Sequence, residues 1–361
     1  MRSDVSSRGK AVAVLVFALM LTGLPGRAAQ SEWEALRTGV FAKLNTIFFT
    51  DELHGWAGGS NGTLIATSDG GASWKRIPLP QQQQRETIRD SWIFSGGRSL
   101  ALGEYGAFSR KSSLGYVERV FMLATIDLGA SWEEMKTESQ PVREAPARIV
   151  SSKDKEPVLE PSKLTRAPDP VLVRIEFADD RNGWACGESG TIQGTSDGGR
   201  TWTLQQSPVR KLLYDISVVD AMTVFVAGAG GTLLQTEDGG RTWIERGTGI
   251  GSVIRAVHFT DRRNGLLVTS TGEIHLTENA GVSWRRCSVP TSRPLNDIIL
   301  VGGEGWAVGD NGTVLHSRDG GRTWVDESFD THAALLRIHF VTARRGWIAG
   351  ANGAIFRLTR Q

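Results

Sequence analysis

Cysteine is almost absent from this sequence. Its 361 residues include only two, Cys186 and Cys287, and these lie far apart in the chain. Two thiols cannot build the set of disulfides that small secreted folds rely on, and a zinc site would need further ligands. We therefore expect two buried thiols and no metal site, with a single disulfide as the alternative.

Long helical patterns are also missing, whereas glycine is abundant with 43 residues, which favours short strands and many turns. The one long apolar run, residues 11–24, follows a basic N-terminus and ends before small residues at 26–28. This run is short for a membrane span, so residues 1–28 are predicted to be a cleaved secretory signal peptide. An uncleaved anchor is the alternative. No cysteine lies nearby, which argues against a lipid anchor.

Neither sign of charge dominates the remaining chain. Residues 1–28 hold four basic side chains and one acidic side chain, so 37 basic and 38 acidic residues follow them. The basic isoelectric point of the whole sequence therefore comes partly from the N-terminal segment. A general attraction to nucleic acid is not supported, and we expect no nucleic-acid partner.

An eight-residue motif recurs through the chain at a fixed period. Residues 195–202 read Thr-Ser-Asp-Gly-Gly-Arg-Thr-Trp. Close copies lie at 236–243 and 317–324, and looser copies lie at 67–74, 125–132 and 277–284. The motif tryptophans Trp202, Trp243, Trp284 and Trp324 are 41, 41 and 40 residues apart. A period near 40 residues with a turn signal in every copy indicates a repeat architecture.

Each repeat has the same order of elements: an apolar strand, a strand like Gly-Trp-Ala, a strand like Gly-Thr-Ile, and then the motif with a fourth strand. Four short strands per repeat predict an all-β fold, a seven-bladed β-propeller of four-stranded antiparallel blades. The propeller is expected to occupy residues 29–361. Its blades are predicted at about 44–74, 88–132, 173–202, 213–243, 254–284, 295–324, and 335–361 plus 31–36.

Two irregularities complete this organisation. The last repeat lacks the motif, and Trp33 stands where its tryptophan would be, so the segment 31–36 is predicted to close the seventh blade. Residues 133–170 are rich in Glu, Lys, Pro and Ser and poor in aromatic residues, which predicts a flexible insertion. The repeat resumes in phase after this stretch.

The acidic position of the motif is interpreted as structural. Asp accepts hydrogen bonds from nearby backbone N–H groups in turns, and Gly supplies positive φ. Identical acids spread around a ring do not converge on one substrate, which argues against catalysis or calcium binding. The motif tryptophan is expected to pack beneath the next blade. The six residues at this position are Asp69, Asp127, Asp197, Asp238, Asn279 and Asp319.

The motif resembles the Asp-box of the bacterial neuraminidase repeat. The whole unit, with its Gly-Trp-Ala-x-Gly strand, resembles the photosystem II stability and assembly factor family over residues 31–361 apart from the insertion. This resemblance implies a secreted propeller without enzymatic activity or cofactor. It also implies an arginine-bearing face that holds a membrane-protein partner in the periplasm, or in a compartment like the thylakoid lumen.

The first functional hypothesis is therefore a binding and assembly scaffold. In a propeller, the loops that link the blades share a face with the turns between second and third strands, and in this chain the linking loops are rich in cations. Arginine suits carboxylates, so we expect a membrane-protein subunit or an acidic peptide as partner. Ordinary solvated side chains are the alternative. The predicted partner-binding residues are Arg76, Arg85, Arg89, Arg210, Lys211, Arg246, Arg255, Arg285, Arg286, Arg293 and Arg337.

Two other hypotheses remain. A sialidase-like glycoside hydrolase would need a tyrosine nucleophile, and the chain has only Tyr105, Tyr116 and Tyr214, of which Tyr116 lies near Glu118. Residues 76–78 resemble part of a sialidase arginine motif but follow the first box instead of preceding it. The third hypothesis is an accessory protein of another bacterial envelope complex. We expect a monomer, and peripheral association with a membrane is compatible with the scaffold hypotheses.

Overall fold

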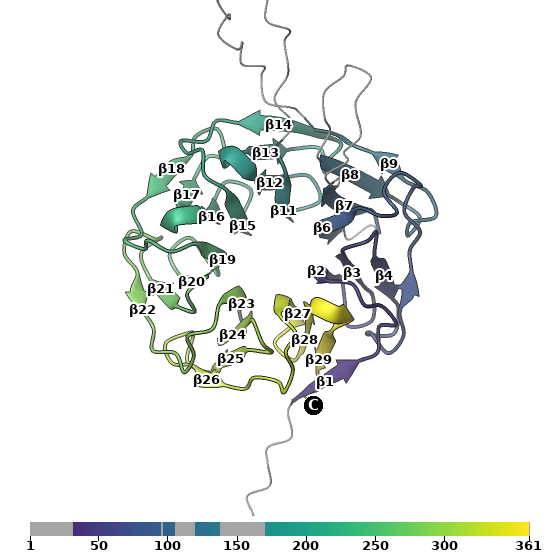
Figure 1. Cartoon of the computed structure of the whole chain (residues 1–361). Coiled ribbons are helices and arrows are strands. Elements are labelled where there is room, and N and C mark those ends of the chain that lie inside the picture. Colours follow the sequence, from purple (N-terminus) through teal and green to yellow (C-terminus); the bar gives the residue numbers. More distant parts are fainter. Residues whose placement is uncertain (1–31, 95–96, 105–119, 138–169, 361) are drawn as a thin grey trace, which may run out of the picture. The chain divides into compact units, whose positions relative to one another are not determined.

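Seven β-sheets form a ring around a central channel (Figure 1). The structure is a computed structural model and describes residues 32–94, 97–104, 120–137 and 170–360. The first strand of each sheet lies innermost, and the following strands lie progressively farther out. This arrangement confirms the predicted seven-bladed propeller. The predicted signal peptide, residues 1–28, lies outside the described part of the chain.

The first four strands of every blade follow one another in chain order from the channel outward, except in the last blade. Blade 1 contains β2 (Leu44–Phe49), β3 (Gly55–Gly59), β4 (Leu64–Thr67) and β5 (Lys75–Arg76). Blade 2 contains β6 (Thr87–Ile93), β7 (Ser99–Glu104), β8 (Val120–Thr125) and β9 (Glu133–Glu134). Blade 3 contains β11 (Leu172–Phe177), β12 (Gly183–Gly187), β13 (Ile192–Thr195) and β14 (Thr201–Gln205). Blade 4 contains β15 (Leu213–Val218), β16 (Val224–Gly228), β17 (Leu233–Thr236) and β18 (Ile244–Arg246).

The remaining blades repeat this order, and the N-terminal strand completes the last one. Blade 5 contains β19 (Ile254–Phe259), β20 (Gly265–Thr269), β21 (Ile274–Thr277) and β22 (Arg285–Arg286). Blade 6 contains β23 (Leu295–Val301), β24 (Glu304–Gly309), β25 (Val314–Ser317) and β26 (Val325–Asp326). Blade 7 contains β27 (Leu335–Thr342), β28 (Arg345–Gly350), β29 (Ile355–Leu358) and β1 (Trp33–Leu36). Three short 3-10 helices join second and third strands: η1 (Glu188–Gly190), η2 (Ala229–Gly231) and η3 (Ala351–Gly353). Among the described residues, no helix is long and apolar enough to cross a membrane.

The N-terminal strand closes the ring as predicted. Strand β1 pairs antiparallel with β29, with Trp33 opposite Leu358. The Trp33 ring is buried against Trp306 of blade 6, at 5.3 Å between ring centroids and an interplanar angle of 83°. The last blade is therefore built from both ends of the described chain, and β1 pairs with the edge that β29 would otherwise expose.

The start of the predicted insertion belongs to the folded ring. Strand β9 pairs with β8 as the outermost strand of blade 2. Strand β10 (Lys136–Thr137) pairs in parallel with β14 and adds a fifth strand to the sheet of blade 3. The predicted boundary at residue 133 was therefore wrong, because backbone pairing with two different blades orders residues 133–137 despite their polar composition. Residues 138–169 lie outside the described part of the chain.

The glycine that opens the second strand is required by a neighbouring phenylalanine. Gly183 lies directly opposite Phe177 in the ladder, and a Cβ atom at this glycine would approach the Phe177 ring to 2.3 Å. Equivalent pairs join Phe49 to Gly55 and Phe340 to Gly346. The phenylalanine ring lies over the missing side chain, which is the physical reason for glycine in the Gly-Trp-Ala pattern.

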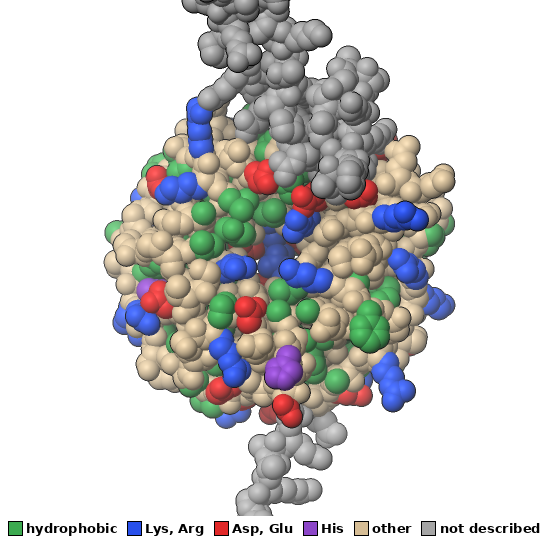
Figure 2. Space-filling view, in the orientation of Figure 1, with side chains coloured by type: hydrophobic (Ala, Val, Ile, Leu, Met, Phe, Trp, Pro, Cys, Tyr) green, Lys and Arg blue, Asp and Glu red, His purple; other side chains and the backbone are tan. Residues whose placement is uncertain are grey.

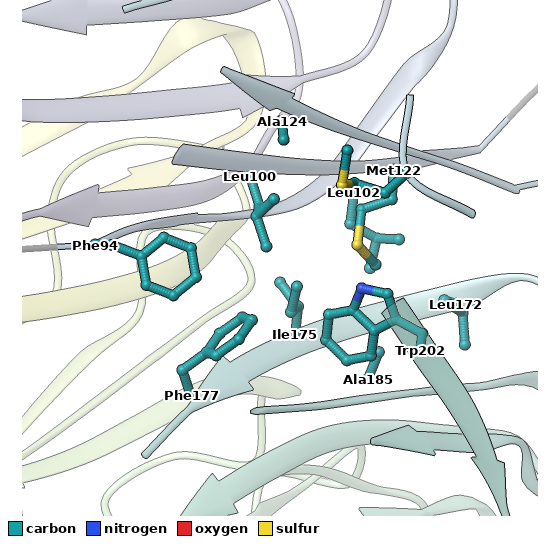
Figure 3. Close-up of a cluster of buried hydrophobic side chains, with 11 residues drawn as sticks. Phe94, Leu100, Leu102, Met122, Ala124, Leu172, Ile175, Phe177, Ala185 and Trp202 are labelled. Atoms are coloured by element: carbon teal, nitrogen blue, oxygen red, sulfur yellow. The ribbon is translucent and has the colours of Figure 1, made fainter. Parts of the chain in front are cut away.

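The core lies between blades rather than within them. Figure 3 shows the Trp202 ring of blade 3 against Leu102 and Met122 of blade 2, with Ile175 and Phe177 completing the cluster. In other clusters, Trp243 of blade 4 joins Trp184 of blade 3, and Trp324 of blade 6 joins Leu266 of blade 5. The motif tryptophan thus packs against the preceding blade, and the expectation that it packs beneath the next blade was wrong.

Each Asp-box is closed by hydrogen bonds within its own turn. Asp238 Oδ1 accepts from Thr236 Oγ1 (2.8 Å) and Thr242 N (2.9 Å), while its Oδ2 accepts from Thr242 Oγ1 (2.7 Å). Hydrogen bonds from the residue four positions later lower the pKa of Asp238 and of Asp69 to about 2. In the fifth box, Asn279 makes the same bonds and donates its Nδ2 to Ser283 Oγ (2.9 Å).

Backbone hydrogen bonds that recur from blade to blade show which turns and loops lie together at each end of the propeller. Glu188 N donates to Val171 O (2.8 Å), so the turn between second and third strands lies beside the loop that enters the blade. Gly198 N donates to Arg181 O (2.8 Å), so the Asp-box lies beside the turn between first and second strands. We call the first end the linking face and the second end the box face. The linking face faces the viewer in Figures 1 and 2.

Both cysteines are buried and form no disulfide, as expected. Cys186 lies on β12 in the interface between blades 3 and 4, and Cys287 follows β22 in the interface between blades 5 and 6. Burial raises the pKa of both thiols, so both are neutral near pH 7.

Candidate functional site

The linking face carries scattered exposed cations around the opening of the channel. Figure 2 shows Lys and Arg side chains at separate places on this face, with polar and apolar surface between them. Of the predicted partner-binding residues, Arg76, Arg85, Arg210, Lys211, Arg255, Arg285, Arg286 and Arg293 are exposed. Arg89, Arg246 and Arg337 are half-buried. These cations are spread from the innermost to the outermost strands and do not form one continuous patch.

Several of these cations already have partners. Lys211 Nζ lies 3.7 Å from Glu245 Oε1, and Arg286 Nη1 lies 3.0 Å from Glu273 Oε1. Arg89 forms an ion pair with Glu104, and Arg246 Nε donates to Gln235 Oε1 (2.7 Å). Such exposed pairs contribute little to stability, but they reduce the positive charge available to a ligand.

The other exposed arginines have no carboxylate within 4.0 Å among the described residues. Arg76 and Arg293 each point a guanidinium N–H at a turn carbonyl, Asn61 O and Asn311 O respectively, both at 3.4 Å. The Arg255 guanidinium lies over the Tyr214 ring at 5.9 Å from its centroid. These interactions leave the charge uncompensated. The set of unpaired exposed arginines is Arg76, Arg85, Arg210, Arg255, Arg285 and Arg293.

Seven of the predicted residues lie within strands instead of linking loops. Four of them, Arg76, Arg246, Arg285 and Arg286, are in the outermost strands β5, β18 and β22, and three are in innermost strands. Arg89 is in β6, Arg255 is in β19 and Arg337 is in β27. The Arg337 side chain is 13% exposed and lies in the channel, where Nη1 is 3.4 Å from Asp297 Oδ1 and 3.7 Å from Asp215 Oδ1. Its assignment to the linking loops was wrong, because a β-bulge between Leu335 and Arg337 starts the strand earlier and aims this side chain at the axis.

The channel wall has an upper ring of side chains at equivalent positions. All seven innermost strands carry a bulge just before this position. The upper ring consists of Thr46, Asp90, Arg174, Asp215, Ala256, Asp297 and Arg337. Its three aspartates were not singled out from the sequence. The sequence pattern that could have identified them is an Asp two residues after a buried aliphatic residue near the start of the strand.

Each aspartate of the upper ring joins neighbouring blades. Asp215 Oδ2 accepts the Val257 backbone N–H (2.9 Å), and Asp297 Oδ2 accepts the Ile338 backbone N–H (2.9 Å). Asp90 Oδ2 likewise accepts the Ile175 N–H (3.0 Å). These bonds connect innermost strands that share no ladder, so the buried carboxylates have a structural role.

A lower ring lies two residues farther along the same strands, toward the box face. It consists of Phe48, Trp92, Glu176, Ser217, His258, Ile299 and His339. Burial raises the pKa of Glu176 to about 8 and lowers the pKa of His258 and His339 to about 4. The two rings enclose a cavity of about 180 Å³. Among the described residues, no group of three or more His, Cys, Asp or Glu side chains is placed to hold a metal ion.

A family model described as Photosynthesis system II assembly factor YCF48 matches residues 26–156, 160–291, 248–332 and 295–359. The chain belongs to the YCF48 family. The matches span all seven blades, so membership rests on the whole propeller and not on one Asp-box.

Curated YCF48 relatives align with parts of the chain. A photosystem II assembly lipoprotein Ycf48 from Synechococcus sp. (strain CC9902) is 42% identical over 55 residues, which is 15% of this chain and 16% of that protein. The protein of the same name from Parasynechococcus marenigrum (strain WH8102) is 36% identical over 91 residues, 23% of this chain and 27% of that protein. The chain thus matches at most 27% of the length of these two relatives.

Solved YCF48 structures share the fold over almost the whole chain. YCF48 bound to a D1 peptide has a TM-score of 0.68 at 20% identity, covering 91% of this chain and 96% of that one. YCF48 from Cyanidioschyzon merolae has a TM-score of 0.68 at 18% identity, covering 90% and 98%. A streptogramin B lyase also matches, with a TM-score of 0.63 at 12% identity, covering 90% and 96%. At these identities the likeness concerns the fold alone.

The residues considered for a sialidase-like reaction are not brought together in the described part of this YCF48-family chain. Tyr214 lies on β15 beneath Arg255, on the linking face. Arg76 points at the Asn61 carbonyl, and Pro78 O accepts the Trp132 indole N–H (2.8 Å). Tyr105, Tyr116 and Glu118 lie outside the described residues.

Proposed function

We propose that this chain is an extracytoplasmic assembly factor without catalytic activity that holds a segment of a membrane-protein subunit on its linking face. The observation that carries the proposal is the set of six exposed arginines that have no carboxylate partner among the described residues, with Arg85, Arg210 and Arg293 in the loops between blades. Planar guanidinium groups bind carboxylates in a bidentate manner, which suits an acidic peptide or a free C-terminus.

Two further observations support this proposal. A family member with the same fold has been solved with a D1 peptide, so a peptide of a photosystem subunit is the first ligand to test. Curated relatives are named lipoproteins, and residues 1–28 of this chain have the composition of a secretory signal. We therefore place the protein in the periplasm or in a compartment like the thylakoid lumen.

The first test is an affinity pull-down from envelope extract with residues 29–361, read by mass spectrometry. Enrichment of photosystem II precursors supports the photosystem role. Enrichment of another membrane complex keeps the scaffold mechanism and changes the partner. If no specific protein is enriched, the scaffold proposal fails and a screen of glycosides becomes the next experiment.

A charge-reversal variant tests the linking face. Arg85, Arg210 and Arg293 lie in loops between blades and have no ion pair among the described residues, so their change to Glu disturbs few internal contacts. We expect loss of the captured partner, with a circular dichroism spectrum and melting temperature close to the wild type. The matched control reverses Arg181, Arg241 and Arg344, which are exposed on the box face. Equal capture by the two triple variants would contradict binding through the linking face.

A further inference from the structure

The channel holds more carboxylates than cations. Asp90, Asp215, Asp297 and Glu176 line it, against the guanidinium groups of Arg174 and Arg337. Both guanidinium groups form ion pairs with the aspartates of the upper ring. Arg174 lies 3.2 Å from Asp90 Oδ2 and 2.8 Å from Asp215 Oδ1, and Arg337 lies between Asp215 and Asp297. Among the residues that line the channel, no cation lies within 4.0 Å of a lower-ring carboxylate.

Glu176 has no ion pair among the described residues, although the charge of Arg174 partly offsets the effect of burial on its pKa. No Lys, Arg or His nitrogen of the described residues lies within 4.0 Å of its carboxylate. Its one hydrogen bond within the described part of the chain comes from Val218 N at 3.4 Å to Oε1, which is long for a charge-assisted bond. An ionised carboxylate in such a wall is unfavourable unless a cation approaches it.

The rest of the lower ring offers only hydrogen-bond acceptors and aromatic faces to a ligand. His258 Nε2 donates to Leu300 O (3.2 Å), and His339 Nε2 donates to Phe49 O (2.9 Å). In the neutral imidazole, each Nδ1 is then an acceptor. The Phe48 ring lies 4.7 Å from both the Trp92 and the His339 ring centroids. Aromatic faces attract cations, and no group of this ring repels one.

The space for a ligand adjoins these side chains. At position 256 the upper ring has an alanine where blades 3 and 7 have Arg174 and Arg337. The cavity of about 180 Å³ is bounded by both rings. This volume exceeds several-fold the roughly 10–15 Å³ that one enclosed water needs, so a group of a few heavy atoms fits.

We propose that the central channel is a binding site for an organic cation, an alkylguanidinium or alkylammonium group, held by Glu176 and the aromatic rings of Phe48 and Trp92. The group can come from a free small molecule or from an arginine or lysine side chain of a partner. The site is separate from the exposed arginines of the linking face, which favour anions. It therefore stands independently of the function proposed above.

The test uses ethylguanidinium chloride as probe, titrated into the folded chain at pH 8.5 and followed by NMR. Saturable shifts of the His258 and His339 imidazole signals are expected. A second titration with a short peptide amide ending in arginine distinguishes the sources: binding of both probes indicates a side chain as ligand, and binding of ethylguanidinium alone indicates a free cation. Absence of saturable shifts with either probe overturns the proposal.

Two variants test whether the Glu176 carboxylate binds the cation. Glu176→Gln should weaken ethylguanidinium binding about 10- to 100-fold, the range that corresponds to one charge-assisted hydrogen bond. Glu237→Gln, which removes an exposed carboxylate on the box face, should leave the affinity unchanged. Equal affinity of wild type and Glu176→Gln would contradict the proposed role of this carboxylate.

A pH series on the unmodified chain keeps the proposal testable if Glu176→Gln fails to fold. Ethylguanidinium keeps its charge between pH 6 and 9, whereas Glu176 takes up a proton as the pH falls below about 8. Affinity should therefore fall from pH 8.5 to pH 6, and a pH-independent affinity would contradict the proposal. The charged and titratable groups that line the channel with Glu176 are Arg174, Arg337, Asp90, Asp215, Asp297, His258 and His339.

Discussion

Arg174 Nε lies 2.8 Å from Asp215 Oδ1, across the boundary between blades 3 and 4. The same guanidinium reaches Asp90 of blade 2 at 3.2 Å, so one side chain joins three consecutive blades at the channel wall. Each of these two carboxylates also accepts a backbone N–H of a neighbouring first strand. The centre of the ring is thus held by a charged network, whereas its outer part is held by apolar packing between blades.

Replacement of this arginine should destabilise the propeller. Arg174→Met leaves Asp90 and Asp215 buried without their cation, and breaking a buried ion pair typically costs about 3–5 kcal/mol. We expect a loss of this size in the free energy of unfolding from urea denaturation. Arg241→Met, which removes an exposed arginine of the box face, is the control and should change the stability little. Equal stabilities of the two variants would show that the network is dispensable.

The fourth Asp-box should contribute to stability and not to partner binding. Asp238→Ala removes the acceptor for Thr236 Oγ1, Thr242 N and Thr242 Oγ1, so the melting temperature should fall. Partner capture well below that temperature should be unchanged. Glu237→Ala changes the neighbouring exposed side chain in the same turn and serves as the control. A folded Asp238→Ala variant that captures no partner would overturn the structural interpretation of the box.

Stability should decrease from pH 7 to pH 8. Burial raises the pKa of Glu176 to about 8 and that of Asp297 to about 7, so the folded chain binds more protons than the unfolded chain in this window. Stability is then lost as the pH rises through the folded-state values. His258 and His339, with pKa values lowered to about 4, are neutral in this window.

The expected slope is roughly 1 kcal/mol or less per pH unit, read from urea denaturation at several pH values. Glu176→Gln should flatten the slope, because the amide does not titrate. An unfolding free energy that rises from pH 7 to pH 8 would mean that Glu176 is ionised in the folded chain.

The glycine that opens β12 should tolerate no side chain. In Gly183→Ala the new Cβ would lie 2.3 Å from the Phe177 ring, and overpacking of this kind usually costs about 1–3 kcal/mol. Gly251→Ala is a matched control, because a Cβ at Gly251 has no neighbour within 4 Å. Both variants can be compared by chemical denaturation. If they are equally stable, the opposed glycine and phenylalanine do not explain the Gly-Trp-Ala pattern.

Local features of the sequence predicted most of the fold. The Asp-Gly-Gly turns, the glycine at the start of several second strands and the period of about 40 residues express short-range turn and strand preferences, so they can be recognised without a structure. The position of Trp33 also predicted the closing strand. The boundary at residue 133 failed because pairing with β8 and β14 depends on the neighbouring blades, and composition does not report on that.

The candidate site was only partly predictable. Exposed arginines in linking loops, such as Arg85 and Arg210, were found because loop position and residue type suffice to place a charge on the surface. Arg337 was misplaced, and Asp215 and Glu176 were missed. Which side chains meet at the axis depends on the bulge in each first strand and on seven blades closing into one ring.

By itself, the sequence determined the repeat, the blade order, the turn chemistry and the likeness to a family, because each depends on patterns that extend over only a few tens of residues. Only the tertiary structure decided that Arg174 pairs with two aspartates, that the motif tryptophan packs on the preceding blade, and that Glu176 has no ion pair among the described residues. The pKa of a carboxyl and the partner of a guanidinium are set by groups from other blades, brought within a few ångströms only when the ring closes.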